Sequence, residues 1–115
     1  MKGTTITDDD QPQGPLTEGG YLILVSMLEP RHGYAVMQHI AQLTNGRVTL
    51  GAGTLYGAIN MLLGRGWIQA VDANQGSRKK QYVTTPQGRR VLTAEIERLE
   101  QLLSIGQAAT ERIKR

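Results

Sequence analysis

The apolar positions of this chain recur at helical spacing in several segments, and the first of these begins near Leu22. The run 22–28 is almost continuously apolar, a pattern that fits either a buried strand or a buried helix. Thr17 is a good helix-capping residue and Pro30 is a stop signal, so the flanks favour a helix over about 17–28. Such a helix would be apolar on two sides, one more than a single core requires.

A second helix is predicted to begin at His32-Gly33-Tyr34 and to run to about Leu43. Asn45-Gly46 follows it, and glycine suits the left-handed residue that often ends a helix. Its apolar residues share one stripe that we expect to face the core: Val36, Met37, Ile40 and Leu43.

The third helix, over about 53–65, has two very different faces. Leu55, Ile59 and Leu62 recur at steps of four and three and form its core stripe. Each glycine inside a helix costs roughly 1 kcal/mol against alanine, so either another surface must approach this backbone closely or the glycines simply face water. The face opposite the stripe is made of small and polar residues, with Thr54 and Tyr56 near its leading end: Gly53, Gly57, Asn60 and Gly64.

A strand pattern over 67–71 and another over 80–84 flank a turn-forming cluster at 74–77, which predicts a β-hairpin. Three adjacent cations would lie at its tip and repel one another unless something negative meets them: Arg78, Lys79 and Lys80.

The last helix is predicted to begin at Thr85-Pro86, a hydroxyl cap followed by a proline at the first helical position. Its apolar residues then follow a seam of alternating four- and three-residue steps that extends past what one small core can cover. The alternative is a helix that lies wholly on its own domain; we favour a homodimer through Leu92, Ile96, Leu99 and Leu103.

Composition divides the 115 residues into three parts within one domain-sized chain. Residues 1–15 are acidic and poor in apolar side chains, and are expected to be a disordered tail. Residues 31–90 hold eight Lys or Arg against one Asp, a net +7 that the overall charge of +3 conceals. A basic middle is the footprint of a polyanionic partner, although it can also be plain solvated charge. We expect a domain over 16–85 and a dimerisation helix over 86–115.

The chemistry of the side chains argues against an enzyme. The chain has no cysteine, and His32 and His39 have no carboxylate at ligand spacing, so neither a catalytic group, a metal site nor a cofactor is predicted. Gly51-Ala52-Gly53 lacks the preceding strand of a nucleotide-binding loop. No apolar segment suits a signal peptide or a membrane span, so a cytoplasmic location is expected.

Four short motifs, in order and at consistent intervals over about 22–92, resemble the PadR-like transcriptional regulators: His32-Gly33-Tyr34, Gly53-Thr54-Leu55-Tyr56, Arg65-Gly66-Trp67-Ile68, and Arg78-Lys79-Lys80-Gln81-Tyr82 with Thr85 and Gly88 after it. The resemblance implies an α+β, mostly helical fold: a winged helix-turn-helix of three helices and a two-stranded wing, with a long C-terminal dimerisation helix. It also implies a repressor that responds to a small-molecule effector. Three places depart from the family pattern: Gly51-Ala52 stands where Ser-Pro is often found, Gly57 where proline is common, and Thr84 where an apolar residue is usual.

Carried over by position, Thr54 and Tyr56 would belong to the recognition helix and its phosphate contacts, and Arg78, Lys79 and Lys80 to the wing. His32, Gly33 and Tyr34 would be mainly structural.

Duplex DNA is the expected partner, because a helix fits its major groove and a hairpin can lie beside it. Gly57 would let the backbone approach, and the amide of Asn60 matches adenine. A dimer would bind a pseudo-palindromic operator. The alternative is a winged-helix module that binds an acidic protein.

Overall fold

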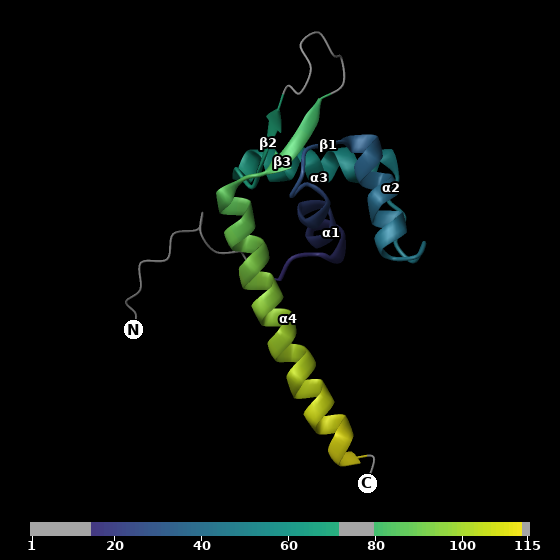
Figure 1. The fold of residues 1–115 in the computed structure, drawn as a ribbon, viewed down its shortest axis with the longest axis vertical. Helices are drawn as coiled ribbons and strands as arrows, with labels where there is room; N and C mark the ends of the chain where they lie inside the picture. The colour runs from purple at the N-terminus through teal and green to yellow at the C-terminus, as the bar shows by residue number, and fades with distance from the viewer. Residues whose placement is uncertain (1–14, 72–79, 114–115) are drawn as a thin grey trace, which may run out of the picture.

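The computed structural model describes residues 15–71 and 80–113. The long last helix projects away from a body that is built from the remaining elements (Figure 1). The elements in chain order are α1 (Glu18–Ser26), β1 (Arg31–His32), α2 (Gly33–Leu43), α3 (Ala52–Arg65), β2 (Ile68–Val71), β3 (Gln81–Thr84) and α4 (Pro86–Ile113).

The three strands form one antiparallel sheet in the order β1-β3-β2. Strands β2 and β3 pair from Ile68↔Thr84 to Val71↔Gln81, which confirms the two predicted strands of the hairpin. The turn 74–77 and the cations Arg78 and Lys79 lie outside the described residues. Strand β1 was not predicted, because two residues are too few to show an alternating pattern; it pairs Arg31 with Tyr82.

The core lies where α1, α2 and α3 meet the sheet and the first turns of α4. Every residue of the α3 stripe is at most 1% exposed, and Leu24, Val36 and Ile40 are fully buried beside it. Leu43 is 49% exposed, so its assignment to the core was wrong. It is the last residue of α2, one turn beyond the point at which Ile40 meets the core.

The predicted helix ends are confirmed by their hydrogen bonds and backbone angles. The Thr17 hydroxyl accepts a bond from the Gly20 N–H at the start of α1, and the Thr85 hydroxyl accepts one from the Gly88 N–H at the start of α4. Past α2, Gly46 has a φ of 81°. Thr85 also donates to the Gly66 carbonyl, 2.7 Å away, which ties the start of α4 to the end of α3.

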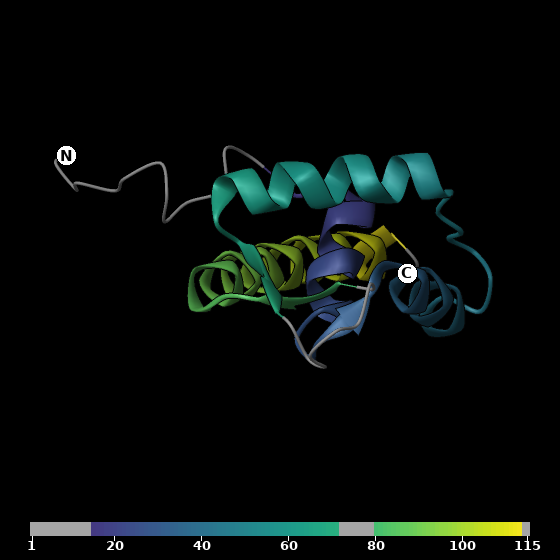
Figure 2. The ribbon, with the colours of Figure 1, turned by 90° about the horizontal axis from the view of Figure 1, so that it is seen from above.

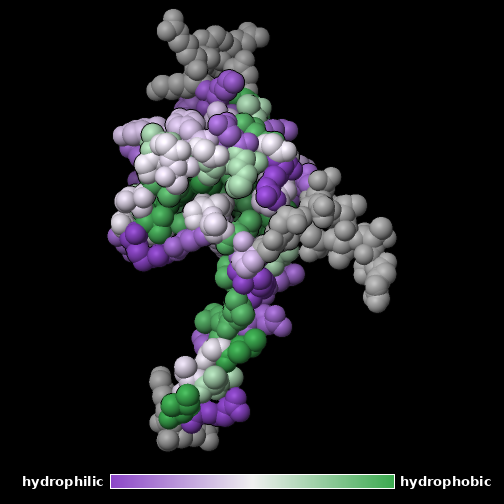
Figure 3. Space-filling view, turned by 180° about the vertical axis from the view of Figure 1, so that it is seen from behind, coloured by the Kyte–Doolittle hydropathy of each residue, from purple (hydrophilic) through white to green (hydrophobic). Residues whose placement is uncertain are grey.

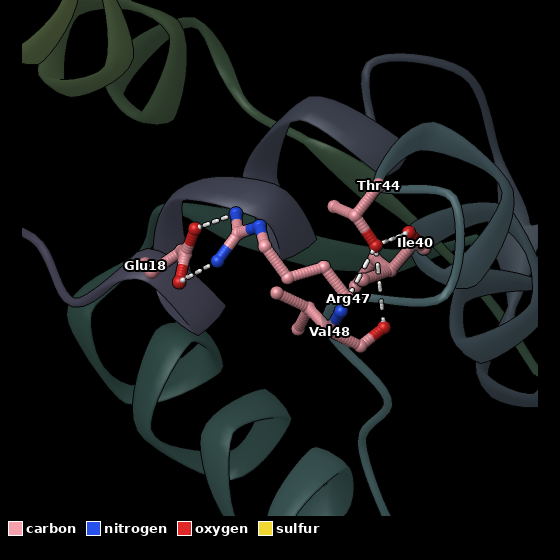
Figure 4. Close-up of polar contacts among 5 residues, drawn as sticks. All are labelled: Glu18, Ile40, Thr44, Arg47 and Val48. Carbon is pink, nitrogen blue, oxygen red and sulfur yellow. Dashed lines mark hydrogen bonds and ion pairs between the residues drawn. The ribbon is translucent and has the colours of Figure 1, made fainter.

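Side chains at the end of α2 and in the loop that follows it hold the α2–α3 loop against the rest of the domain (Figure 4). The Thr44 hydroxyl donates to the Ile40 carbonyl and accepts from the Val48 N–H. Both terminal nitrogens of Arg47 donate to the Glu18 carboxylate, and these hydrogen bonds lower the pKa of Glu18. The pair is exposed, so it contributes little to stability. It does, however, commit one cation of the basic middle to a carboxylate within the domain.

Thr84, which replaces the usual apolar residue in β3, is 3% exposed and has partners for its polar groups. Its hydroxyl donates to the Leu24 carbonyl at 2.9 Å, and its N–H donates to the Met27 carbonyl at 2.7 Å. A buried hydroxyl is tolerated when it is hydrogen-bonded. The substitution therefore joins β3 to the end of α1 without leaving an orphaned polar atom.

Gly88 lies where α4 begins and has no room for a side chain. A Cβ built there would stand 2.1 Å from the Trp67 carbonyl oxygen and 2.7 Å from the Thr84 Cγ2 atom. The first contact is with backbone, which cannot rotate aside. Gly88 thus fixes how closely α4 can approach the strand that follows α3.

We expect Gly88→Ala to lower the free energy of unfolding by about 1–3 kcal/mol, the usual cost of overpacking a tight core. Chemical denaturation followed by circular dichroism would measure it. Gly64→Ala is the matched control, because a Cβ there meets no atom within 4 Å and should raise stability through helix propensity. An equally stable Gly88→Ala protein would contradict the packing described for α4.

Candidate nucleic-acid interface

Helix α3 presents the glycine-lined face to the outside. Its buried stripe fixes the rotation of the helix, and an added Cβ at Gly53, Gly57 or Gly64 would meet no atom within 4 Å. Thr54, Tyr56 and Asn60 are exposed on the same helix. The backbone of this face is therefore open to approach by a large partner.

The arrangement of the elements makes this open face part of one end of the molecule. Helix α3 and strands β2 and β3 lie together at the end opposite the C-terminus of α4 (Figure 1). Seen from above that end, α3 is visible along its whole length, and no element of the described residues covers it (Figure 2). A partner that approaches from this side would meet α3 and the sheet together.

Tyr56 leans from α3 onto the start of α2. Its side chain is 45% exposed, and its hydroxyl would lie 2.4 Å from a Cβ built on Gly33. Gly33 is therefore the residue that allows the tyrosine to lie across the first turn of α2. This contact gives a physical reason for the glycine in the His32-Gly33-Tyr34 motif, which the family resemblance treats as mainly structural.

A cavity of about 480 Å³ opens beside Tyr56 at the junction of α2, α3 and the sheet. His32 helps to shape it, because its Nδ1 atom lies 3.2 Å from the Lys80 carbonyl and links β1 to the base of the hairpin. No carboxylate lies among the residues that line the cavity, which are His32, Gly33, Tyr34, Ala35, Tyr56, Lys80 and Tyr82.

Tyr34 was one of three aromatic candidates for an effector contact, but sequence reasoning did not place it beside Tyr56 and Lys80. It is 65% exposed and lines the cavity with Tyr56 and Lys80, residues that stand 22 and 46 positions later in the chain. The pairing of β1 with β3 brings the start of α2 beside Lys80, and a two-residue strand leaves no periodic signal. Only the polar tip of Tyr34, ahead of the apolar stripe of α2, hinted at an exposed position.

The cations of the basic middle do not all point toward a partner. Arg31 lies 3.8 Å from the Glu29 carboxylate, and the Arg65 guanidinium lies 5.1 Å from the centre of the Trp67 ring. Arg47 is likewise bound to Glu18, so several of these cations have contacts inside the domain. Lys80 is exposed at the base of the hairpin, next to the cavity.

The first turns of α4 pack on the body through Val91, Leu92 and the unexpected Glu95. The sequence pattern placed Glu95 outside the apolar seam, yet it is 3% exposed. Arg98 donates to both of its carboxylate oxygens, at 2.9 and 2.6 Å, and these bonds lower the pKa of Glu95, with a further contribution from the backbone of Leu16. Charge pairing explains how a carboxylate can be buried here.

Beyond Glu95 the apolar residues of α4 have no covering element within the described part of the chain. Figure 3 shows green, apolar side chains along the projecting part of this helix, beside purple, hydrophilic ones. The exposed apolar residues of this part of α4 are 38% to 81% exposed. We call them the α4 stripe: Ile96, Leu99, Leu102, Leu103, Ile105 and Ile113. Leu92, by contrast, is 5% exposed and belongs to the core of the single chain.

Helices α1 to α3 followed by the β2–β3 hairpin define a winged helix-turn-helix, and a long helix is appended to it. The family model of the transcriptional regulator PadR-like family matches residues 22–94, and the chain belongs to that family. The resemblance carried by the four motifs is therefore confirmed. No curated protein matches the sequence significantly.

Solved structures of several regulators have the same fold. A PadR family transcriptional regulator from Eggerthella lenta is 31% identical, with a TM-score of 0.59 over 75% of this chain and 70% of that one. A transcriptional regulator from Clostridium thermocellum gives a TM-score of 0.66 at 20% identity, over 79% and 90%. Bacillus subtilis PadR in complex with operator DNA gives 0.62 at 21% identity, over 72% of this chain and 48% of that one.

Two further properties follow from the described residues alone. No helix among them is both long and apolar enough to cross a membrane. In the same part of the chain, no three His, Asp or Glu side chains come together as a group that could hold a metal ion. The family itself consists of regulators of transcription.

Proposed function

We propose that the protein is a dimeric repressor that binds a pseudo-palindromic DNA operator through α3 and the hairpin, and that a small-molecule effector releases it. The observation that carries the proposal is the open, glycine-lined face of α3, which lies at one end of the molecule with the sheet. It is supported by the relationship to B. subtilis PadR, whose structure was solved with operator DNA.

On this proposal α3 enters the major groove with Gly57 near the middle of the contact. The absence of side chains at Gly53, Gly57 and Gly64 would let the helix backbone come close to the walls of the groove. Thr54 and Tyr56 would donate hydrogen bonds to backbone phosphates, which set the register of the protein without reading sequence. Asn60 would pair with the N6 and N7 atoms of an adenine.

The wing residues Arg78, Lys79 and Lys80 would follow the phosphates beside the groove. Of the three, Lys80 lies in the described part of the chain. It is exposed and lines the same cavity as Tyr56. Long, flexible cations neutralise phosphates well but are poorly fixed for reading base edges. The wing should therefore supply affinity and little specificity.

We expect Lys80→Ala to weaken binding to operator and to random DNA by similar factors. The slope of log Kd against log salt should fall by about one unit for each phosphate that a subunit no longer neutralises. Fluorescence anisotropy titrations at several salt concentrations would measure both. Lys80→Arg keeps the charge and should retain the slope, whereas an unchanged slope in Lys80→Ala would remove this residue from the interface.

Dimerisation is proposed to use the α4 stripe, so that residues 86–115 join two DNA-binding domains formed by residues 16–85. The contact would use Ile96, Leu99 and Leu103, which are 38–59% exposed in the single chain. Leu92 would support it from within the core. Two copies related by a two-fold axis would read half-sites about 34 Å apart or a multiple of that spacing.

Release by an effector is proposed because the cavity beside Tyr56 is the size of a small-molecule site. Its volume of about 480 Å³ falls in the usual range of about 300–1,000 Å³ for ligand pockets. Tyr56 and Lys80 belong both to its lining and to the proposed DNA contact. A molecule bound there would compete directly with the phosphate backbone.

Selection of binding sites from random duplex DNA tests the proposal. The result we expect is a pseudo-palindromic site whose complex with the protein resists competition by random DNA. A protein-binding winged helix, the alternative function, would bind duplexes through charge alone, so random DNA would compete equally. That outcome would overturn the DNA-reading role, even if binding depended strongly on salt.

A further inference from the structure

The exposed face of α3 carries one large apolar side chain in its second half, Met61, which the proposed DNA contacts leave unused. Met61 is 48% exposed. Residues four before and three after it are its neighbours on the helix surface, and these are Gly57 and Gly64. Because a Cβ at either glycine would meet no atom within 4 Å, the thioether stands between two gaps.

Asn60 stands beside Met61 on the same face, and Gly57 and Gly64 are its surface neighbours as well. The two side chains are thus the ones that rise above a trough of glycines. In a close approach of α3 to the floor of the major groove, they would reach the base edges first. The trough between them allows that depth.

The chemistry of the two side chains is selective. A thioether has no hydrogen-bond donor and only a weak acceptor, and the one apolar feature that bases present in the major groove is the thymine methyl group. The flexible methionine chain can adapt to such a group. Helix α3 has no Lys or Gln, and its single Arg, Arg65, lies against the Trp67 ring. The centre of the exposed α3 face therefore has no Arg or Lys side chain that could donate two hydrogen bonds to a guanine.

We propose that Met61 is a specificity residue that contacts a thymine methyl group, and that with Asn60 it makes α3 read adjacent A·T base pairs. The inference rests on the proposed DNA-binding function. The alternative is that Met61 is one of the scattered apolar side chains that are common on protein surfaces. In that case Met61→Ala would not change how the protein responds to the loss of a thymine methyl group.

The test uses the full-length protein and a duplex selected by it from a random pool. Each thymine of the half-site is replaced in turn by deoxyuridine, which removes only the methyl group. With the wild-type protein, one replacement should weaken binding about fourfold, which corresponds to about 0.8 kcal/mol for one buried methyl-sized group. With Met61→Ala, the same replacement should have no further effect.

Two matched variants separate a base contact from a general effect on the helix. Met61→Gln keeps the length of the side chain and should also lose the response to deoxyuridine. Leu63→Ala removes another exposed apolar side chain, about 200° around the helix, and should keep that response. Thermal unfolding of each variant would verify that α3 remains folded.

Each outcome decides the proposal. An equal loss in wild type and Met61→Ala would show that the methyl group is read by another residue, and would overturn it. Insensitivity of the wild type to every replacement would also overturn it, while leaving the selected duplex as evidence for DNA binding. If no duplex can be selected, the proposed function fails and this inference fails with it.

Discussion

Gly57→Leu should abolish operator binding and leave the protein folded. Gly57 is exposed on α3, and an added Cβ meets nothing within 4 Å, so the larger side chain fits the free protein. Leucine is a better helix former than glycine by roughly 0.8–1.0 kcal/mol, so the melting temperature should rise by a few degrees. The same side chain would occupy the space in which we place the floor of the major groove.

The measurements are a thermal melt and a titration with the selected operator. Gly57→Ala is the graded control: it should gain most of the helix stability while adding only a methyl group to the interface. Tyr56→Phe removes one hydroxyl and should cost about 1.5–3 kcal/mol of binding if that group donates to a phosphate. A folded Gly57→Leu protein that binds its operator at full strength would refute the placement of α3.

Replacing Leu99 and Leu103 by Glu should convert the proposed dimer into monomers. Both side chains are exposed in the single chain, at 40% and 59%, so the change leaves its core untouched. In a dimer they would place four carboxylates in an apolar contact, where unpaired charges are strongly disfavoured. Light scattering would report the mass, and loss of the link between half-sites should weaken operator binding by about 10² to 10⁴.

Gln101→Glu with Ser104→Glu provides the control for that experiment. Both residues are exposed on the same part of α4 but lie away from Leu99 and Leu103 around the helix, and the double change adds the same charge. This variant should remain dimeric. A dimer that survives Leu99→Glu with Leu103→Glu would place the interface elsewhere on the molecule.

The helices were predictable because each one carries a local signal of its own. Leu55, Ile59 and Leu62 have the spacing of a buried stripe, and Thr17 and Thr85 are hydroxyl caps at the positions where α1 and α4 begin. These features depend on neighbours within one or two turns. A single sequence displays such neighbours directly.

What the sequence did not reveal depends on residues that are distant in the chain. Strand β1 exists because β3 offers it a partner about 50 residues later, and that pairing builds the cavity around Tyr34. Glu95 is buried because α4 passes the start of the domain, where the Leu16 backbone donates to its carboxylate; Arg98, one turn further along α4, completes the pairing of its charge. The pattern of polar and apolar residues in the sequence had predicted that the Glu95 carboxylate lies off the apolar seam, in solvent.

The continuity of α4 has a mechanical consequence. It runs for 28 residues, about 42 Å at 1.5 Å per residue, from Pro86, just before the Gly88 contact with Trp67, to Ile113, the last residue of the α4 stripe. If two copies meet along that stripe, each α4 acts as a stiff lever arm between the partner and the DNA-reading end. A tilt of about 5° about one end of α4 would displace its other end by about 3–4 Å. That shift equals roughly one base-pair step, so the crossing angle of the two arms would set which operator spacings fit.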